Sequence, residues 1–243
     1  MQSDSNSDLV RATAYDKSKA TEYDDYRFTD IAGKAIHDAE SRILLDTIKT
    51  IPSSGSVLEV GCGTGRLMVE VSKLGYHIDG ADASGPMLAE AGAKFVDAEL
   101  SPEFYLCEAA NLSCKEDRYD FCYSIRLLNQ TESDEYALAV VRDMIRVTKP
   151  GGKCLVEFVN TNRPRWGMNK RPTTRLSPRA VLQTAEANGT RLVEWNGAFF
   201  ISMQAYKKVP KWALKAASKV DNFLSELFPR LCSRVYLTVE KRD

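Results

Sequence analysis

Short apolar runs alternate with amphipathic stretches along this chain of 243 residues. Apolar runs bounded by charged or turn residues are typical of buried strands, whereas apolar positions three and four apart are typical of helices. The pattern predicts strands at 56–60, 77–82, 103–108, 120–125, 153–159, 191–206 and 233–241. It predicts helices at 38–50, 66–73, 87–93, 133–148, 178–188 and 211–228.

The alternation of strands and helices predicts an α/β fold with a doubly wound, mostly parallel sheet. No internal repeat or low-complexity linker divides the sequence, so we expect a single domain over residues 1–243. Residues 1–35 are expected to form an N-terminal cap segment, and residues 207–230 a helical insertion before the last strand. Ligands of such sheets bind beyond the carboxyl ends of the strands.

Composition narrows the possible partners. Lys plus Arg (33) equals Asp plus Glu (33), so no global field attracts nucleic acid or an anionic membrane. The six cysteines form no C-x-x-C pair and adjoin neither of the two histidines, which favours free thiols and no metal. The N-terminus lacks a signal-peptide pattern, and no apolar run approaches the ~20 residues of a membrane span. The expected location is the cytoplasm.

A glycine-rich turn follows the first predicted strand, with Gly61, Gly63 and Gly65 spaced as G-x-G-x-G. Such a turn lets a ligand lie against the backbone, although an ordinary strand-to-helix turn would also account for the glycines. The dinucleotide-binding pattern needs its last glycine one residue later, where Arg66 stands. Glu59, two places before the turn, would repel a pyrophosphate but suit a cationic ligand.

A second acidic residue, Asp82, ends the second predicted strand twenty-one residues after Gly61. A carboxylate in this place can accept two hydrogen bonds from a ribose diol. The alternative is a loop residue that caps the next helix, a role that Ser84 fills better. Met87 in that helix offers an apolar surface for a purine. Together, the turn and Asp82 indicate an adenosine attached to a positive centre.

With these features in order, the chain resembles the class I S-adenosylmethionine-dependent methyltransferases, especially the small-molecule enzymes that include quinone C-methyltransferases. The resemblance covers roughly residues 40–160, and its motifs lie at 57–67, 80–84, 107–112 and 146–152. It implies a Rossmann-like methyltransferase fold, with a seven-stranded sheet whose last strand is antiparallel, and S-adenosylmethionine as the cofactor.

The resemblance also implies roles for individual residues. Glu59 would hold the methionine ammonium group, Asp82 the ribose hydroxyls, and Glu108 the adenine amino group. Aspartate is commoner where Glu108 stands. The full set of expected cofactor-binding residues is Tyr26, Arg27, Glu59, Gly61, Gly63, Asp82, Ala83, Met87, Glu108, Ala109 and Ser124.

Acceptor contacts are expected beyond the fourth and fifth strands, although no residue is assigned to the chemical step. The candidates are Arg126, Asn129 and Asn160. Arg126 either pairs with a carboxylate or phosphate of the substrate, or with an internal acid. His37 and His77 are poorly placed for a general base and are interpreted as structural.

The predicted helix at 211–228 carries an apolar face, and its burial against the domain is the first expectation. A lid over the substrate, a dimer contact and a helix on a membrane surface are the alternatives. The apolar face consists of Trp212, Ala216, Val220, Phe223, Leu224 and Leu227.

The expected function is transfer of a methyl group from S-adenosylmethionine to a small-molecule acceptor, by in-line displacement that relies mainly on proximity and orientation. One alternative is a non-catalytic S-adenosylmethionine-binding regulatory protein. Another is methylation of a lipid-like or quinone acceptor at a membrane surface, with peripheral contact through residues 211–228 but no stable insertion. Nucleic acid is not an expected partner, and the chain is expected to be a monomer or a homodimer.

Overall fold

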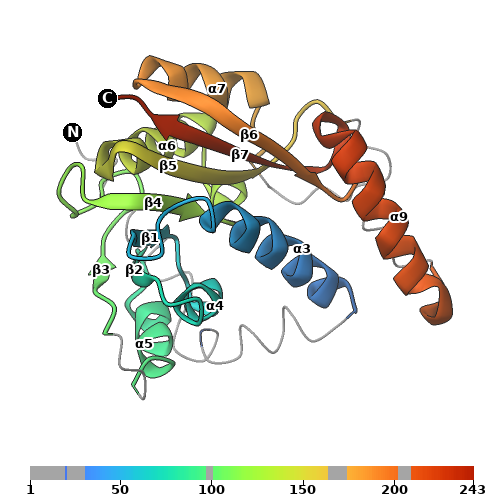
Figure 1. The fold of residues 1–243 in the computed structure, drawn as a ribbon, viewed down its shortest axis with the longest axis horizontal. Coiled ribbons are helices and arrows are strands. Elements are labelled where there is room, and N and C mark those ends of the chain that lie inside the picture. Colours follow the sequence, from blue (N-terminus) through green and yellow to red (C-terminus); the bar gives the residue numbers. More distant parts are fainter. Residues whose placement is uncertain (1–19, 21–30, 97–100, 164–173, 202–208) are drawn as a thin grey trace.

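The computed structural model describes residues 20, 31–96, 101–163, 174–201 and 209–243. Its described strands form one seven-stranded sheet in the order β3-β2-β1-β4-β5-β7-β6 (Figure 1). The strands are β1 (Ser56–Val60), β2 (His77–Asp82), β3 (Phe104–Leu106), β4 (Tyr119–Ser124), β5 (Thr148–Val159), β6 (Thr190–Ala198) and β7 (Arg234–Lys241). The helices are α3 (Ile31–Ile48), α4 (Arg66–Ser72), α5 (Gly85–Ala93), α6 (Asp134–Val147), α7 (Pro178–Ala187) and α9 (Leu214–Leu227).

The sheet is parallel except at its last strand in sequence. Strands β3, β2, β1, β4 and β5 pair in parallel, and β7 runs antiparallel to both β5 and β6. From β1 the chain winds toward β3 and then returns to add β4 on the other side, so β1 and β4 flank the topological switch point. The predicted fold is confirmed, and the expected ligand position lies at the carboxyl ends of these strands. The single-domain organisation stays a prediction.

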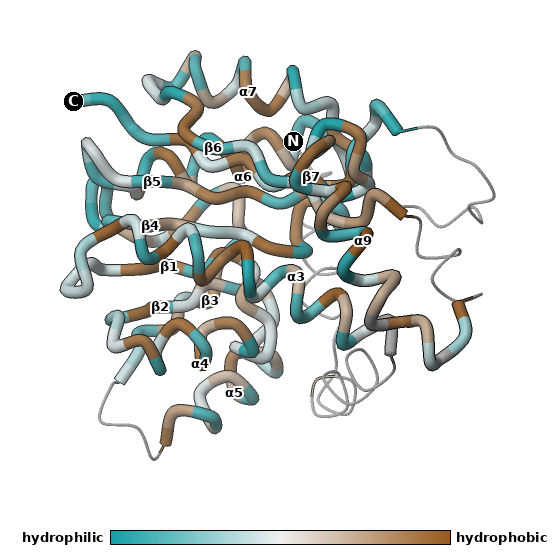
Figure 2. The backbone as a smooth tube through the Cα atoms, turned by 45° about the vertical axis from the view of Figure 1, so that its right-hand side comes forward, coloured by the Kyte–Doolittle hydropathy of each residue, from teal (hydrophilic) through white to brown (hydrophobic). Residues whose placement is uncertain are grey.

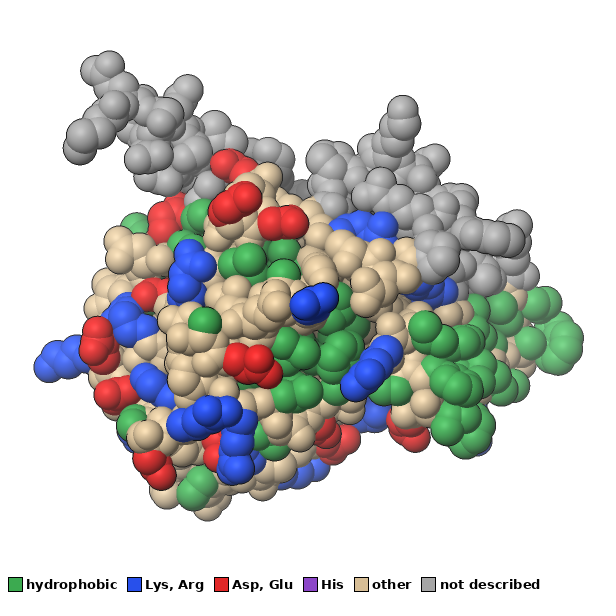
Figure 3. All heavy atoms as spheres, turned by 90° about the horizontal axis from the view of Figure 1, so that it is seen from above, with side chains coloured by type: hydrophobic (Ala, Val, Ile, Leu, Met, Phe, Trp, Pro, Cys, Tyr) green, Lys and Arg blue, Asp and Glu red, His purple; other side chains and the backbone are tan. Residues whose placement is uncertain are grey.

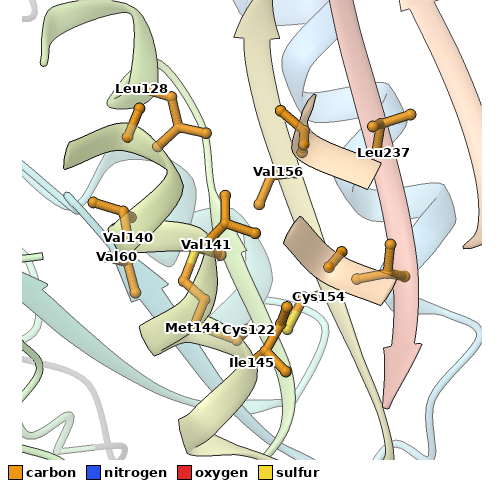
Figure 4. Close-up of a cluster of buried hydrophobic side chains, with 14 of the residues drawn as sticks. Val60, Cys122, Leu128, Val140, Val141, Met144, Ile145, Cys154, Val156 and Leu237 are labelled. Carbon is orange, nitrogen blue, oxygen red and sulfur yellow. The ribbon is translucent and has the colours of Figure 1, made fainter. Parts of the chain in front are cut away.

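Alternate residues of the central strands enter two different apolar cores, because successive side chains of a strand point to opposite faces. On one face, Leu58 and Val60 pack with Cys122, Val156 and α6. Figure 4 shows Val60, Cys122 and Val156 together with side chains of α6. On the other, Val57, Phe121 and Leu155 pack with α3 and α4. Helix α7 joins the α6 side and turns its hydrophobic positions toward the sheet (Figure 2).

Five strands have bounds that differ from the prediction: β4 and β7 differ by a single residue, and β3, β5 and β6 differ by more. Strand β5 begins at Thr148 rather than 153, because Thr148 pairs with Tyr119 before a register shift in β4. Strand β6 ends at Ala198 because Phe199 takes a left-handed conformation (φ 63°) that ends the strand. Strand β3 is limited to its three central residues. Helix α3 begins at Ile31, inside the segment expected to form a cap.

The expectation that the apolar face of the helix at 211–228 is buried against the domain is wrong. Helix α9 occupies this part of the chain, and the side chains of Phe223 and Leu227 are exposed. The helix is covered instead on a polar face, at Asp221 and Ser225. None of the helices within the described ranges is long and apolar enough to cross a membrane.

A buried ion pair joins β5 to β7. Glu157 is fully buried, and its Oε1 contacts the guanidinium of Arg234. Its other oxygen, Oε2, accepts a hydrogen bond from the backbone N–H of Arg126 at 2.7 Å. This carboxylate therefore ties the antiparallel edge of the sheet to the segment that follows β4.

We expect Glu157→Gln to lower the free energy of unfolding by about 3–5 kcal/mol, because the substitution leaves the positive charge of Arg234 buried without its counter-ion. Urea denaturation monitored by circular dichroism measures the loss. The matched control is Glu240→Gln, because Glu240 pairs at 2.6 Å with Arg191, whose side chain is 62% exposed. That control should cost less than about 1 kcal/mol. Equal losses of unfolding free energy in the two variants would show that burial does not determine how much the ion pair of Glu157 contributes to stability.

Candidate active site

A cavity of about 270 Å³ opens at the carboxyl ends of β1, β2 and β4. Its lining comes from the glycine turn, the end of β2, the start of α5, the segment after β3, the segment after β4 and the first turn of α6. The lining residues are Glu59, Gly61, Cys62, Gly63, Thr64, Arg66, Leu67, Asp82, Ala83, Ser84, Met87, Glu108, Ala109, Ile125, Arg126, Leu127, Gln130, Thr131 and Tyr136. Eight of the expected cofactor-binding residues are therefore brought together.

The glycine turn passes through left-handed conformations that favour glycine. Gly61 has a φ of 74° and Gly63 a φ of 53°. The backbone N–H groups of Gly61 and Cys62 both donate to the carbonyl of Ala81, at 2.8 and 3.1 Å, which fastens the turn to β2. A Cβ atom on Gly63 would meet nothing within 4 Å, so the backbone there is open to a ligand.

Asp82 is held in place by the same turn. Its Oδ2 accepts a hydrogen bond from the N–H of Gly63 at 2.8 Å, and its Oδ1 accepts one from the N–H of Ser84 at 2.9 Å. Burial raises the pKa of Asp82, although these backbone donors act in the opposite direction. The Ser84 hydroxyl caps α5 by accepting from the N–H of Met87. Each carboxylate oxygen can accept a further hydrogen bond, so Asp82 can also bind a ligand hydroxyl.

Glu59 is the most deeply buried acid of the lining, with 4% of its surface exposed. The Tyr123 hydroxyl donates to its Oε2 at 2.9 Å. Burial raises the pKa of Glu59 to about 8, and the hydrogen bond from Tyr123 offsets only part of this effect. A cationic group in the cavity would favour the ionised form of Glu59.

Glu108 is oriented by a residue that sequence reasoning missed. Tyr136, in the first turn of α6, donates its hydroxyl hydrogen to Oε2 of Glu108 and lines the same cavity. No local pattern in the sequence indicates this contact, because it joins residues 28 positions apart.

Arg126 pairs with an internal acid, which was one of its two expected partners. Glu40 of α3 is fully buried and accepts hydrogen bonds from Arg126 at 3.4 Å and from Arg66 at 2.6 Å. The backbone of Arg126 is left-handed, with a φ of 67°. Both arginines line the cavity, so Glu40 positions two cationic side chains at its wall.

Two candidate residues, Ser124 and Asn160, lie outside the cavity lining. Ser124 is fully buried, and its hydroxyl donates to the carbonyl of Val60 at 2.8 Å. Asn160 is also fully buried, with its Nδ2 donating to the carbonyls of Arg230 and Cys232, each at 3.0 Å. The polar groups of both side chains bind backbone carbonyls, and neither side chain lines the cavity.

The remaining candidates lie beside the cavity or outside the described residues. Asn129 is half-buried and does not line the cavity, whereas its neighbours Gln130 and Thr131 do. Tyr26 and Arg27 fall within residues that the structure does not describe. His37 contacts Arg66 and lies 3.0 Å from Glu70, so its ring joins α3 to α4.

The lining fits the cofactor that the resemblance implies. Carboxyl groups at Glu59, Asp82 and Glu108 would face an ammonium group, a ribose and an adenine amino group, respectively. Ala83 and Met87 supply apolar surface to the same lining. The open backbone at Gly63 leaves room for close approach.

Comparisons with known proteins agree with this fit. A family model described as a methyltransferase domain matches residues 57–152. The tRNA (carboxymethyluridine(34)-5-O)-methyltransferase of Xenopus tropicalis is 26% identical over 60% of this chain, but the match covers only 22% of that protein. The ubiquinone/menaquinone biosynthesis C-methyltransferase of Pseudomonas paraeruginosa is 31% identical, over 57% of this chain and 54% of the relative.

Solved structures share the fold over most of the chain. The magnesium protoporphyrin IX methyltransferase of Synechocystis with bound S-adenosylhomocysteine has a TM-score of 0.64 and 16% identity, covering 96% of this chain and 97% of that one. The 1,6-didemethyltoxoflavin-N1-methyltransferase of Burkholderia thailandensis has a TM-score of 0.64 and 15% identity, covering 98% and 90%. At these identities the likeness establishes the fold.

The glycine turn yields a matched pair of variants. We expect Gly63→Ala to lower the free energy of unfolding by about 1 kcal/mol, the cost of a left-handed backbone for alanine. Gly61→Ala should cost more, because its Cβ would also lie 3.0 Å from three atoms of Leu127. Urea denaturation compares the two variants. If Gly61→Ala were no costlier than Gly63→Ala, the packing against Leu127 would not constrain the turn.

The raised pKa of Glu59 predicts a pH-dependent affinity for S-adenosylhomocysteine, which carries the same ammonium group as the methyl donor. The dissociation constant should fall by up to about tenfold per pH unit from pH 6 toward 8, as the carboxyl ionises, and level off above about 8. Isothermal titration calorimetry measures this slope, which Glu59→Gln should flatten. If the dissociation constant of the variant had the same pH dependence as that of the wild type, Glu59 would not be the group that binds the ammonium.

In the absence of ligand, Glu59 makes the folded state less stable, rather than more stable, as the pH rises. The folded chain retains a proton on Glu59 that the unfolded chain releases between pH 4.5 and about 8, so this group's contribution to stability falls as the pH rises through that range. Glu59→Gln should therefore be more stable, relative to the wild type, at pH 9 than at pH 6. Thermal denaturation at the two pH values checks the sign.

Proposed function

We propose that this chain, whose residues 57–152 match a methyltransferase-domain family model, is a class I S-adenosylmethionine-dependent methyltransferase that transfers a methyl group to a small-molecule acceptor. The observation that carries the proposal is the placement of Glu59, Asp82 and Glu108 around one cavity whose wall includes the glycine turn. The match to the tRNA-modifying relative spans about a fifth of that protein, so the acceptor is argued from this chain's own residues.

In the proposed complex the chain's acids bind and orient the cofactor from three sides. Glu59, ionised by the nearby cation, would hold the ammonium group, while Asp82 would accept hydrogen bonds from the ribose. Glu108, fixed by Tyr136, would accept a hydrogen bond from the adenine amino group. The bound cofactor supplies a methyl group on a sulfonium, which is open to in-line attack.

The acceptor would lie against the segment after β4, on the wall formed by Ile125, Arg126 and Leu127. Arg126 is the cationic side chain of this wall, and Glu40 holds its guanidinium. The described lining contains no histidine or lysine to act as a base. Rate acceleration would therefore come mainly from holding the nucleophile in line, an effect worth up to about 7–11 kcal/mol.

A small acceptor is favoured over RNA by the disposition of charge. Lys plus Arg equals Asp plus Glu over the whole chain, so its charge provides no general attraction for a polyanion. Two arginines near residues 164–173 are half-buried and contact the backbone: Arg163 donates to the carbonyl of Phe200, and Arg175 to that of Arg163. RNA methylation is the second candidate function, because several relatives, among them those of Xenopus tropicalis, Macaca fascicularis and Arabidopsis thaliana, are named tRNA methyltransferases.

The proposal predicts where a radiolabelled methyl group will go. The protein is incubated with tritiated S-adenosylmethionine and either a low-molecular-weight cell extract or total tRNA. We expect label in the extract and a loss of about 10²-fold or more in Asp82→Ala, which removes two charge-assisted hydrogen bonds to the ribose. The matched control is Asp46→Ala, because the Asp46 side chain is 67% exposed on α3.

Three results would contradict parts of the proposal. Label in tRNA alone would show that the acceptor is RNA, as the second candidate function states. Binding of S-adenosylhomocysteine with no label in either pool would favour a regulatory protein that binds the cofactor without catalysis. Full activity in Asp82→Ala would overturn the assignment of the cofactor site.

A further inference from the structure

Helix α9 presents its polar side to the protein and its apolar side to solvent. Among the described residues of the helix, the two that are fully buried are polar: Asp221 is 3% exposed and Ser225 is 2% exposed. Asp221 accepts a hydrogen bond from the N–H of Ile201 at 2.5 Å, and Ser225 accepts one from the N–H of Phe200 at 3.3 Å. These contacts attach the helix to the segment after β6 through hydrogen bonds, which is the reverse of ordinary amphipathic packing.

The opposite side forms an apolar stripe, which we define as Trp212, Val220, Phe223 and Leu227. Their exposures are 87%, 51%, 63% and 57%, and their spacing places them along one side of the helix and its preceding turn. Figure 3 shows apolar side chains gathered at the end of the molecule where α9 lies. A contiguous exposed patch of this kind marks a surface that contacts something else.

The sequence around the start of α9 is strongly basic. Residues 211–219 contain three lysines and no acid, in a chain whose charges balance overall. Lysines near a helix N-terminus oppose the helix dipole, so their placement costs helix stability. The described side chain of Lys219 is exposed beside the stripe. The segment therefore combines an apolar stripe with positive charge that an anionic partner would neutralise.

We propose that α9 and the turn before it lie on an anionic lipid membrane surface, with the stripe among the acyl chains and the lysines against the lipid phosphates. RNA would neutralise the lysines but leave the stripe in water. A second copy of the chain would cover the stripe but leave the lysines unneutralised. An anionic bilayer would both cover the stripe and neutralise the lysines. None of the described residues of α9 lines the active-site cavity, so the proposal does not depend on the methylation reaction.

The test is flotation of the whole protein with vesicles of phosphatidylcholine, alone or mixed with phosphatidylglycerol. We expect binding to the anionic vesicles that weakens with added salt. Phe223→Ser/Leu227→Ser and Lys215→Glu/Lys219→Glu should each reduce partitioning by about tenfold or more. The matched controls, Leu74→Ser/Val193→Ser and Lys73→Glu/Lys115→Glu, change exposed residues elsewhere and should bind as the wild type does.

Thermal denaturation confirms that each variant is folded, and S-adenosylhomocysteine binding reports the active site separately. The proposal is overturned if the wild type stays unbound with anionic vesicles, or if the stripe variant binds them as well as its control. Two further results would overturn it. One is a wild-type protein that does not bind vesicles but forms a dimer by light scattering, with the stripe variant monomeric. The other is a protein whose lysines bind RNA but not vesicles.

Discussion

The site depends on the hydrogen bonds that fasten the glycine turn to the end of β2. The carbonyl of Ala81 holds the N–H groups of Gly61 and Cys62, and the carboxylate of Asp82 holds the N–H of Gly63. Two parallel strands are thereby joined at their carboxyl ends through the residues that line the cavity. The same contacts hold the left-handed turn and orient Asp82, so the geometry of this cavity wall follows from the attachment of the turn to β2.

Buried charge secures the other wall. Glu40 joins α3 to Arg66 and Arg126, while Glu157 holds Arg234 and the backbone of Arg126. Carboxylates removed from water are tolerated only with such partners. Arg126 is consequently fixed at its guanidinium and at its backbone, and the left-handed conformation at this residue is supported from two directions. Helix α3 therefore supports the cavity wall through Glu40, although none of its described residues lines the cavity.

Sequence reasoning succeeded where the signal was local. The periodicity of apolar residues predicted the order of strands and helices, and the spacing of Glu59, Gly61 and Asp82 from strand ends placed them at one cavity. It failed where a strand-end residue turns to the backbone: Ser124 and Asn160 stand at outlets of the right strands, but hydrogen bonds to carbonyls occupy their polar groups. Tyr136 had no signal at all.

The sequence by itself therefore determined the α/β alternation, the glycine turn and the acids beside it, because periodicity, backbone freedom and strand ends are properties of neighbouring residues. The tertiary structure alone decided the pairing of Glu40 with Arg66, 26 residues away, and the side of α9 that faces solvent. An amphipathic pattern is the same whether its apolar face is buried or exposed. Which face is buried is determined by contacts such as those of Asp221 and Ser225, which exist only once β6 is in place.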